Sequence, residues 1–365
     1  MKLVVFGLSI SSSWGNGHAT LWRGLIGGLA RRGCRVTFFE RDTSYYAGAR
    51  DLWEVPSGRL VLYPDWESVR SEARREVGEA DVAMVTSFCP DGIAAAELIH
   101  ELPVGLTVFY DLDTPVTLSA LERGEALPYV GPRGLQDFGL VLSYTGGAAL
   151  DRLQAALGAR CVAPLYGHVD PGVHRPVKPV EHYRADLSYL GTYAADRQAA
   201  LATLLLDVAY RRPEQRYLIG GAQYPADFPW CPNLYFVRHL PPDEHPGFYC
   251  SSRLTLNITR AAMAEMGWCP SGRLFEAAAC GTPVLSDRWA GLEEFFVPGQ
   301  EILVARNTGD AVAALDMDET ELRRIGRAAR ERALEDHTSD RRATELLALF
   351  DMARRPTRGA VGVEA

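Results

Sequence analysis

The sequence lacks paired cysteines, long apolar runs and an excess of positive charge. Its seven cysteines are scattered and never form a Cys-x-x-Cys pair, which favours buried, reduced thiols over a disulfide framework. No stretch approaches the roughly 18–20 uninterrupted apolar residues of a membrane-spanning helix. The opening run MKLVVFGLSISSS breaks into Ser and Gly too early for a secretory signal and is typical of a first strand. We therefore expect a soluble, cytoplasmic protein.

The charge balance argues against several classes of partner. Lys and Arg number 38 against 46 Asp and Glu, a net charge of −8. This balance argues against a broad surface for nucleic acid or for an anionic membrane. A local basic pocket for one small phosphate ligand stays compatible with it. The 365 residues, 47% hydrophobic and 23% charged, fit two globular domains of ordinary size.

Short apolar runs rich in β-branched residues alternate with helical patterns, which is typical of parallel α/β sheets. In the first half we predict strands at 2–8, 35–39, 60–63, 82–86, 105–110, 140–143 and 161–164, with helices at 19–32 and 91–100. In the second half we predict strands at 187–190, 216–219, 234–237, 254–257, 283–286 and 301–304, with helices at 195–211, 271–280, 292–296 and 319–350. Two Rossmann-like domains follow from this alternation.

The composition changes between these two series. The run YGHVDPGVHRPVKP holds two Gly and three Pro and has no helical period, so it predicts a hinge. The expected divisions are a first domain at 1–168, a hinge at 169–177 and a second domain at 178–338. A last helix at 339–353 and a frayed tail at 354–365 complete the chain.

The loop after the opening strand is the first candidate site. Gly15 and Gly17 allow a tight turn around Asn16, and the helix that follows offers free N–H groups to an anion or a sugar hydroxyl. His18 lies where such a loop faces the cleft of an open sheet, so it is a candidate for sugar binding or acid–base catalysis. The dinucleotide fingerprint fails, since Thr20 stands in place of its third glycine. An ordinary glycine turn stays open as the alternative.

A pair of carboxylates forms the second candidate. Asp111 and Asp113 follow a strand end in YDLDTPVTL, and Asp113-Thr114-Pro115 is a good helix start. Because such a turn would separate the two carboxylates, we expect no metal site here. Asp113 is the candidate for contact with a donor or an acceptor, with a catalytic role.

Two further strand-to-helix junctions carry cations. Gly191 and Thr192 precede a helix with Arg197 in its first turn, a combination that can hold a diphosphate. In NITRAAMAEMGWCPSGRLFEAAACGTP, the candidates are Asn257, Arg260, Ser271, Gly272, Arg273 and Glu276. Their helix supplies N–H groups and a guanidinium for phosphates, and a carboxylate for two ribose hydroxyls.

At these residues the sequence resembles the GT-B glycosyltransferases, specifically the CgeB-like (spore maturation protein) branch related to the group 1 enzymes. The resemblance implies that Glu276 binds the donor ribose and that Ser271, Gly272 and Arg273 meet the diphosphate. It places Arg197 at the lysine that pairs with the phosphates. His239 and Leu240 fall in the loop that meets the nucleobase.

Two positions depart from the group 1 pattern. Trp268 stands where a glutamate usually meets the transferred sugar, and Thr192 replaces an arginine. The resemblance also implies that the last helix crosses back onto the first domain, as is common in this fold.

The expected function is metal-independent transfer of a sugar from a nucleotide-diphosphate-sugar, taken as a UDP-sugar, to an unknown acceptor with retention of configuration. His18, Asp113 and Arg273 are the expected catalytic residues, and no cofactor and no metal ligand are expected. The alternatives are a non-catalytic nucleotide-sugar-binding protein, an epimerase or hydrolase, and a periplasmic-type binding protein.

Overall fold

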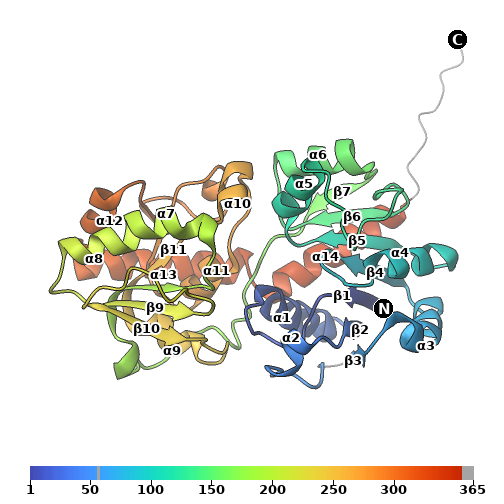
Figure 1. Ribbon diagram of the computed structural model, residues 1–365, viewed down its shortest axis with the longest axis horizontal. Helices are drawn as coiled ribbons and strands as arrows, with labels where there is room; N and C mark the ends of the chain where they lie inside the picture. The colour runs from blue at the N-terminus through green and yellow to red at the C-terminus, as the bar shows by residue number, and fades with distance from the viewer. Residues whose placement is uncertain (56–57, 356–365) are drawn as a thin grey trace, which may run out of the picture.

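The computed structural model describes residues 1–55 and 58–355 and arranges them in two α/β lobes side by side (Figure 1). The first lobe contains a seven-stranded parallel sheet of order β3-β2-β1-β4-β5-β6-β7. Its strands are β1 (Lys2–Gly7), β2 (Arg35–Arg41), β3 (Gly58–Tyr63), β4 (Val82–Thr86), β5 (Thr107–Asp111), β6 (Leu140–Ser143) and β7 (Val162–Pro164). Its helices are α1 (Gly17–Arg31), α2 (Ser44–Ala47), α3 (Trp66–Gly78), α4 (Gly92–Glu101), α5 (Thr114–Glu122) and α6 (Ala148–Leu157).

Both faces of this first sheet are covered, which explains why its strands are apolar without alternation. All five residues of β4, Val-Ala-Met-Val-Thr, are buried. One face packs under α1 and the last helix, where Trp22, Leu346 and Phe350 share a core. The other face packs under α3, α4 and α6. The predicted strands of this half are confirmed, with ends shifted by at most two residues.

The second lobe contains a six-stranded parallel sheet of order β10-β9-β8-β11-β12-β13. Its strands are β8 (Ala185–Leu190), β9 (Tyr217–Gly221), β10 (Leu234–Arg238), β11 (Ser252–Asn257), β12 (Val284–Ser286) and β13 (Leu303–Val304). Its α-helices are α7 (Gln198–Leu201), α8 (Asp207–Arg211), α9 (His245–Cys250), α10 (Ala261–Met266), α11 (Gly272–Ala279), α12 (Thr308–Leu315) and α13 (Glu319–Asp336). The predicted pair of Rossmann-like domains is therefore confirmed.

Three helices differ from the sequence prediction. The continuous helix expected at 195–211 is divided by a π-helical turn at Ala202–Leu206, where the Thr203 hydroxyl donates to the Ala199 carbonyl at 3.0 Å and competes with the regular ladder. The segment expected as a helix at 292–296 is a single 3-10 turn, Leu292–Glu294. The region 319–350 is two helices, α13 and α14 (Ser339–Arg354).

The last helix, α14, returns to the first domain and lies against α1 (Figure 1). A Cβ atom on Gly28 of α1 would lie 2.7 Å from the Ser339 carbonyl oxygen, so only glycine permits this approach. Asp340 accepts hydrogen bonds from Arg31 Nε at 3.0 Å and from Arg32 Nη1 at 2.6 Å. The chain thus crosses between the domains twice.

The two crossings meet at a short bridge. Val169 pairs with Thr338, and the Val169 amide donates to the His337 carbonyl at 2.9 Å. The buried imidazole of His168 lies 2.9 Å from the Ser339 hydroxyl. The hinge expected at 169–177 begins at this bridge, and its movement stays a prediction. The tail expected at 354–365 lies outside the described residues from 356 onward.

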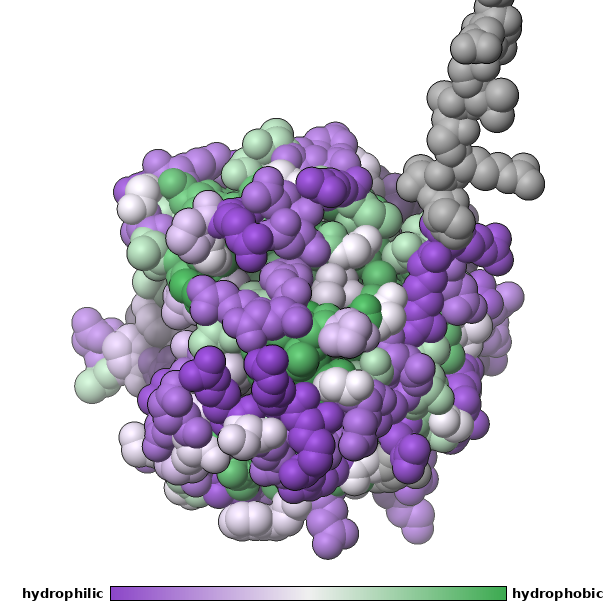
Figure 2. Space-filling view, turned by 90° about the vertical axis from the view of Figure 1, so that its right-hand side faces the viewer, coloured by the Kyte–Doolittle hydropathy of each residue, from purple (hydrophilic) through white to green (hydrophobic). Residues whose placement is uncertain are grey.

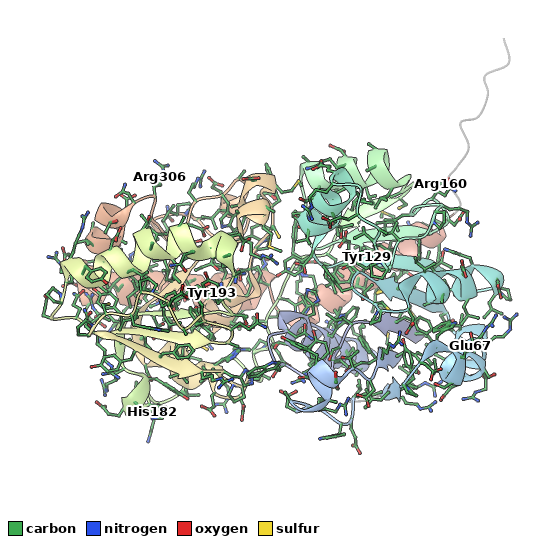
Figure 3. The ribbon with its side chains drawn as sticks, in the orientation of Figure 1. Glu67, Tyr129, Arg160, His182, Tyr193 and Arg306 are labelled. Carbon is green, nitrogen blue, oxygen red and sulfur yellow. The ribbon has the colours of Figure 1, made fainter. Side chains whose placement is uncertain are left out.

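Charged side chains cover the outside of both domains. Glu67, Arg160, His182 and Arg306 lie at the periphery, whereas Tyr129 and Tyr193 lie further in (Figure 3). The outer end of the first domain is mostly hydrophilic with small hydrophobic areas between (Figure 2). Within residues 1–55 and 58–355, no helix combines the length and the apolar character needed to cross a bilayer.

Candidate active site between the domains

A cleft of about 670 Å³ lies between the two domains and is lined by both of them. It opens at the carboxyl ends of β1, β5, β8 and β11, the edge at which parallel sheets place their ligand-binding loops. All the predicted site residues except Asn257 line this cleft. The fold therefore brings together loops that lie as much as 260 residues apart in the sequence.

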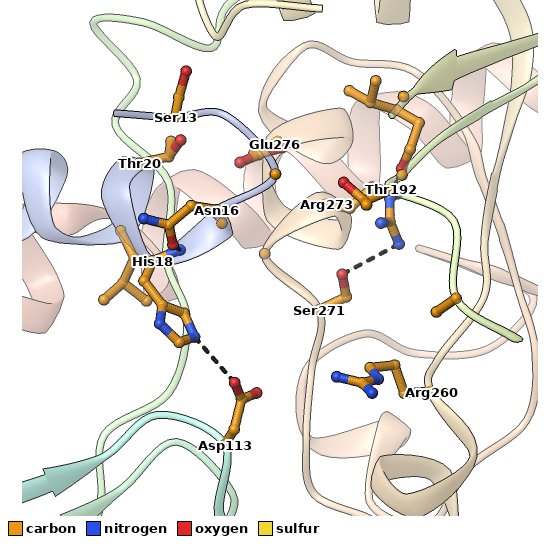
Figure 4. A pocket seen from close by; sticks show the side chains of 18 of the residues that line it. Ser13, Asn16, His18, Thr20, Asp113, Thr192, Arg260, Ser271, Arg273 and Glu276 are labelled. Atoms are coloured by element: carbon orange, nitrogen blue, oxygen red, sulfur yellow. Dashed lines mark hydrogen bonds and ion pairs between the residues drawn. The ribbon is translucent and has the colours of Figure 1, made fainter. Parts of the chain in front are cut away.

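The first domain contributes a histidine–aspartate pair. Asn16 caps α1 and accepts the His18 amide at 3.1 Å, which fixes the start of the helix and directs His18 at the cleft. His18 Nε2 lies 3.3 Å from Asp113 Oδ2, and each side chain is 20% exposed (Figure 4). His18 Nδ1 is buried and has no hydrogen-bond partner. The nitrogen that faces the cleft is therefore the one beside Asp113.

Asp111 and Asp113 do not converge. Asp113 is the N-cap residue of α5, while Asp111 is fully buried and accepts from the Asp113 amide and the Thr117 hydroxyl, both at 3.1 Å. Burial raises the pKa of Asp111 to about 6, although these two donors oppose the shift. As expected from the turn, only Asp113 is presented to a substrate.

Arg273 lies at the opposite wall of the cleft, across the ends of β8 and β11. Its Nε donates to the Leu190 carbonyl, and its Nη1 donates to Asn257 Oδ1 at 3.1 Å and to the Ser271 hydroxyl at 3.4 Å (Figure 4). A Cβ on Gly191 would lie 2.8 Å from Arg273 Nη2, so the glycine makes room for the guanidinium. Ser271 is the N-cap residue of α11, as predicted, but its side chain makes no capping bond.

Asn257 lies behind Arg273 and not at the surface of the cleft. It is fully buried, and its Nδ2 donates to the Ser286 hydroxyl at 3.0 Å. The predicted direct contact between Asn257 and the ligand is thus not provided by the geometry, because the strand end directs this side chain into the sheet. Its amide oxygen positions Arg273 instead.

Two more guanidinium groups border the same part of the cleft. Arg197 Nη1 donates to the Thr192 carbonyl at 3.2 Å, while its Nε is buried without a partner. Burial lowers the pKa of Arg197, and the neighbouring Arg273 and Arg260 lower it further. Arg260 pairs with Asp196 at 3.3 Å. Three cations near one another with a single carboxylate partner favour an anionic ligand.

The carboxylate of Glu276, one helical turn after Arg273 on α11, also lines the cleft. Its Oε2 accepts from the Tyr249 hydroxyl at 3.3 Å and lies 3.7 Å from His245 Nδ1 and 4.0 Å from His174 Nε2. Burial alone would raise the pKa of Glu276, but the two histidines and Arg273 outweigh it and hold the pKa at about 2. The group is therefore an anion throughout the physiological range.

Sequence reasoning missed His174 and His245. His174 is buried in the segment between the domains, and His245 begins α9, 71 residues further along the chain. Each is a single histidine in a loop with no spacing motif. The available signal was the position of His174 inside the run predicted as a hinge.

The predicted nucleobase loop also borders the cleft. His239 has a φ of +51°, and its ring centroid lies 4.6 Å from that of Trp14 in the other domain. The buried Leu240 offers its carbonyl to His245 Nε2 at 3.1 Å. Gln223 Nε2 donates to the Tyr45 hydroxyl at 2.9 Å across the cleft. The part of the cleft beside the predicted nucleobase loop is thus formed by residues of both domains.

Trp268, at the position of the group 1 glutamate, does not line the cleft. Its ring lies between Gly147 and Gly291, where added Cβ atoms would each come within 2.6 Å of it. Its Nε1 donates to Glu294 Oε1 at 2.6 Å, and its carbonyl accepts from the Gly146 amide at 3.0 Å. The residue therefore joins the domains, and the next two residues, Cys269 and Pro270, line the cleft.

Residues 197–348 match the family described as "Glycosyl transferase-like". Sucrose-phosphate synthase from Thermosynechococcus elongatus superposes with a TM-score of 0.70 at 14% identity, covering 96% of this chain and 98% of that one. Anabaena Alr3699/HepE, solved with UDP and glucose, superposes with a TM-score of 0.68 at 12% identity, covering 96% and 100%. An α-glucosyltransferase solved with UDP and a 13-mer DNA gives 0.70 at 13% identity, covering 96% and 99%.

This chain has the GT-B fold. At these identities the likeness establishes the architecture, and the matched family segment covers the part of the GT-B chain that holds Arg197, Arg260, Arg273 and Glu276. No curated protein sequence matches the chain. The CgeB-like assignment stays a prediction.

Proposed function

We propose that this GT-B protein is a glycosyltransferase that moves a sugar from a nucleotide-diphosphate-sugar, with UDP as the expected nucleotide, to an acceptor still to be identified. The observation that carries the proposal is one cleft lined by the guanidinium groups of Arg197, Arg260 and Arg273 and by the ionised carboxylate of Glu276. A diphosphate fits the cations, and two ribose hydroxyls fit the carboxylate. The family match and the UDP named for two superposed structures support the same donor class.

The proposed chemistry breaks the bond between the sugar's anomeric carbon and the β-phosphate oxygen and forms a bond from that carbon to an acceptor oxygen. Negative charge grows on the leaving diphosphate, so preorganised donors aimed at it lower the barrier. Arg273 is already held by Leu190, Asn257 and Ser271 and needs little rearrangement. We propose that the arginines neutralise the diphosphate in place of a divalent ion.

His18 and Asp113 face this part of the cleft from the first domain and are proposed to hold the transferred sugar. The resemblance implies retention, in which the leaving diphosphate takes the acceptor's proton. Inversion would instead assign that proton to the His18–Asp113 pair. NMR of the product's anomeric signal decides between these outcomes. Because the net charge is −8, we expect an acceptor other than nucleic acid.

A panel of nucleoside diphosphates and nucleotide-sugars tests the proposal. A ligand that binds only the folded protein raises its melting temperature, so the matching donor is expected to give the largest shift. Formation of a glycosylated product from that donor with an acceptor library would then confirm transfer. If no nucleoside diphosphate shifted the melting temperature or bound by calorimetry, the proposal would be wrong.

A non-catalytic nucleotide-sugar-binding protein is the second candidate. It is favoured by Trp268, which leaves the cleft without the carboxylate that the group 1 enzymes place at that position. It predicts saturable donor binding with no turnover. An epimerase or hydrolase would differ from both by releasing product from the donor alone.

A further inference from the structure

Three side chains from separate segments direct ligand-type atoms at one point beside the cleft. His174 Nε2 and His245 Nδ1 are 3.4 Å apart, and both face Glu276 Oε2, at 4.0 Å and 3.7 Å. Within the described residues, this is the one group of three His, Cys, Asp or Glu side chains close enough to share a metal ion. The group was not expected from the sequence.

The separations are too long for good hydrogen bonds and suit a shared ion. N–H···O bonds have donor–acceptor distances of roughly 2.7–3.2 Å, and neither contact to Glu276 meets that range. The nearest point equidistant from the three atoms lies in their plane, about 2.2 Å from each, close to the roughly 2.0–2.2 Å of Zn–N and Zn–O bonds. Packed around an empty centre, these atoms have only the long contact between the two imidazoles, at 3.4 Å, and the Tyr249 hydroxyl on Glu276, at 3.3 Å.

The surrounding contacts orient two of the three groups as ligands, whereas His174 Nδ1 is buried without a hydrogen-bond partner. His245 Nε2 lies 3.1 Å from the Leu240 carbonyl, and when it donates its hydrogen there, the lone pair of Nδ1 is left for the centre. The Tyr249 hydroxyl donates to the Glu276 carboxylate at 3.3 Å. The His174 side chain is only 1% exposed, whereas His245 and Glu276 border the cleft. The site is thus closed on one side and open to the cleft on the other.

We propose that His174, His245 and Glu276 bind one divalent transition-metal ion of the Zn²⁺ class. Two imidazoles and one carboxylate with an open position are a recurrent zinc ligand set. The remaining position faces the part of the cleft assigned to the donor ribose, so a ribose hydroxyl or a water completes the coordination. Only this last assignment rests on the proposed glycosyltransferase function. The arginines remain the proposed counter-charge of the diphosphate.

Metal binding is measured directly on the full-length protein, without an activity assay. The purified chain is stripped with a chelator, dialysed and titrated with Zn²⁺ by calorimetry and with Co²⁺ by visible absorption. We expect one equivalent of ion and the intense ligand-field bands of Co²⁺ in a low-symmetry site. Elemental analysis of protein grown with zinc should also show one equivalent.

Substitutions assign the ion to this cluster. Glu276→Gln and His245→Ala are expected to weaken Zn²⁺ binding more than about 100-fold, whereas Tyr249→Phe, which removes an outer hydrogen bond, is expected to weaken it about 10- to 100-fold. His182→Ala, on an exposed histidine of the same domain, is the matched control and should bind like the wild type. Because His174 is buried and its loss can unfold the segment, His174→Ala is compared only after circular dichroism confirms folding.

Wild-type protein that takes up no Zn²⁺ or Co²⁺ at micromolar concentrations would overturn the proposal, as would binding that survives both ligand substitutions. In the latter case the seven free cysteines would be the source. Failure of the glycosyltransferase proposal is separately visible, because that proposal requires the wild-type chain to bind a nucleoside diphosphate, which is measured independently of the metal. Metal binding without nucleotide binding would leave this inference standing and remove the other.

Discussion

The two walls of the cleft differ in what they offer a ligand. The first domain presents the paired His18 and Asp113, in which the charged carboxylate already has a partner. The second domain presents the guanidinium groups of Arg197, Arg260 and Arg273 and a carboxylate held ionised. The guanidinium groups of the second domain are only partly neutralised by protein carboxylates, which favours binding of an anionic ligand on that wall. Under the proposed function, the nucleotide diphosphate would bind the second domain, and the reacting sugar and acceptor would bind the first.

The origin of the difference lies in the strand ends. In the second domain, Gly191 has no side chain, and the space is filled by Arg273, 82 residues later in the sequence. In the first domain, the equivalent loop holds Gly15 and Gly17. A Cβ on Gly15 would lie 3.2 Å from the Tyr45 hydroxyl, and a Cβ on Gly17 would meet nothing within 4 Å. The two domains have similar folds, but a different side chain lies beside the loop glycine in each, and the chemistry of the two walls differs accordingly.

Arg273→Ala is the strongest test of this asymmetry. The loss of a preorganised donor to the leaving diphosphate is expected to lower kcat/KM about 100- to 1,000-fold, roughly 2.7–4 kcal/mol of transition-state stabilisation. Arg273→Lys should recover only part of it, because a lysine cannot bridge Leu190 and Asn257 as a planar fork does. Steady-state kinetics on the matching donor measure both variants.

The matched control is Arg306→Ala, which removes an exposed arginine of the same domain outside the cleft. It should retain wild-type kinetics and melting temperature. Wild-type turnover in Arg273→Ala would show that Arg273 does not stabilise the leaving diphosphate. The proposed difference between the two walls of the cleft would then be wrong.

His18→Ala tests the opposite wall. Since His18 is assigned to the sugar and not to the nucleotide, kcat is expected to fall by up to about 100-fold while the affinity for the nucleoside diphosphate stays unchanged. Calorimetry with the nucleoside diphosphate and turnover with the full donor separate these two quantities. An equal loss of nucleotide affinity and turnover would contradict the division of labour between the walls.

Gly28→Ala tests how far the first domain depends on the helix that returns to it. The added Cβ would lie 2.7 Å from the Ser339 carbonyl and 3.0 Å from the Ala343 Cβ, so α14 must shift, at a cost of about 1–3 kcal/mol in unfolding free energy. Nucleotide affinity, which the proposed function assigns to the second domain, should be retained. Chemical denaturation with two probes, one for each domain, reports the change.

Gly27→Ala is the control on the adjacent residue. There the nearest atom to an added Cβ is Arg31 Nη1 at 3.5 Å, an ordinary contact with a flexible side chain. This substitution should be neutral or stabilise the helix by up to about 1 kcal/mol. Equal destabilisation by both alanines would show that helix propensity, and not the close approach of α14, determines the result.

The strands and the main ligand-binding helix could be predicted from the sequence because their signals are local. Continuous apolar runs such as VVFGL predict strands covered on both faces. The run Pro-Ser-Gly-Arg predicts the start of α11, with Arg273 in its first turn. The resemblance to a known family added roles for Arg273 and Glu276. These roles stay proposals, while the cleft that contains both residues is observed.

What the sequence could not provide depends on contacts between distant segments. Asn257 was expected at the ligand, but the direction of its side chain is set by Ser286 and Arg273. His174 and His245 meet only because the segment between the domains returns against α9. The π-helical turn near Thr203 adds a residue to a pattern that otherwise has a regular helical period. Each of these follows from packing and not from local propensity.

The smallest expected effect is a dependence of stability on pH. It arises at the bridge between the two domains, where His168 lies beside Ser339. Burial, assisted by Arg342, lowers the pKa of His168 to about 3, and its Nε2 has no partner. Since an unfolded histidine has a pKa near 6.5, the unfolded chain binds the proton first, and the folded state loses stability as the pH falls below about 6.5. Between pH 7 and 5.5 this amounts to about 1 kcal/mol for His168 alone.

His168→Asn should therefore reduce the slope of unfolding free energy against pH in this range, because asparagine keeps a polar atom near Ser339 but does not titrate. Denaturation midpoints at pH 7, 6.2 and 5.5 measure the slope. The expected difference between His168→Asn and the wild type is the contribution of one buried histidine. His182→Asn, on the exposed histidine, should keep the wild-type slope. If His168→Asn kept it as well, the acid sensitivity would have to come from other histidines whose pKa burial lowers, such as His337 at the same bridge or His100 inside the first domain.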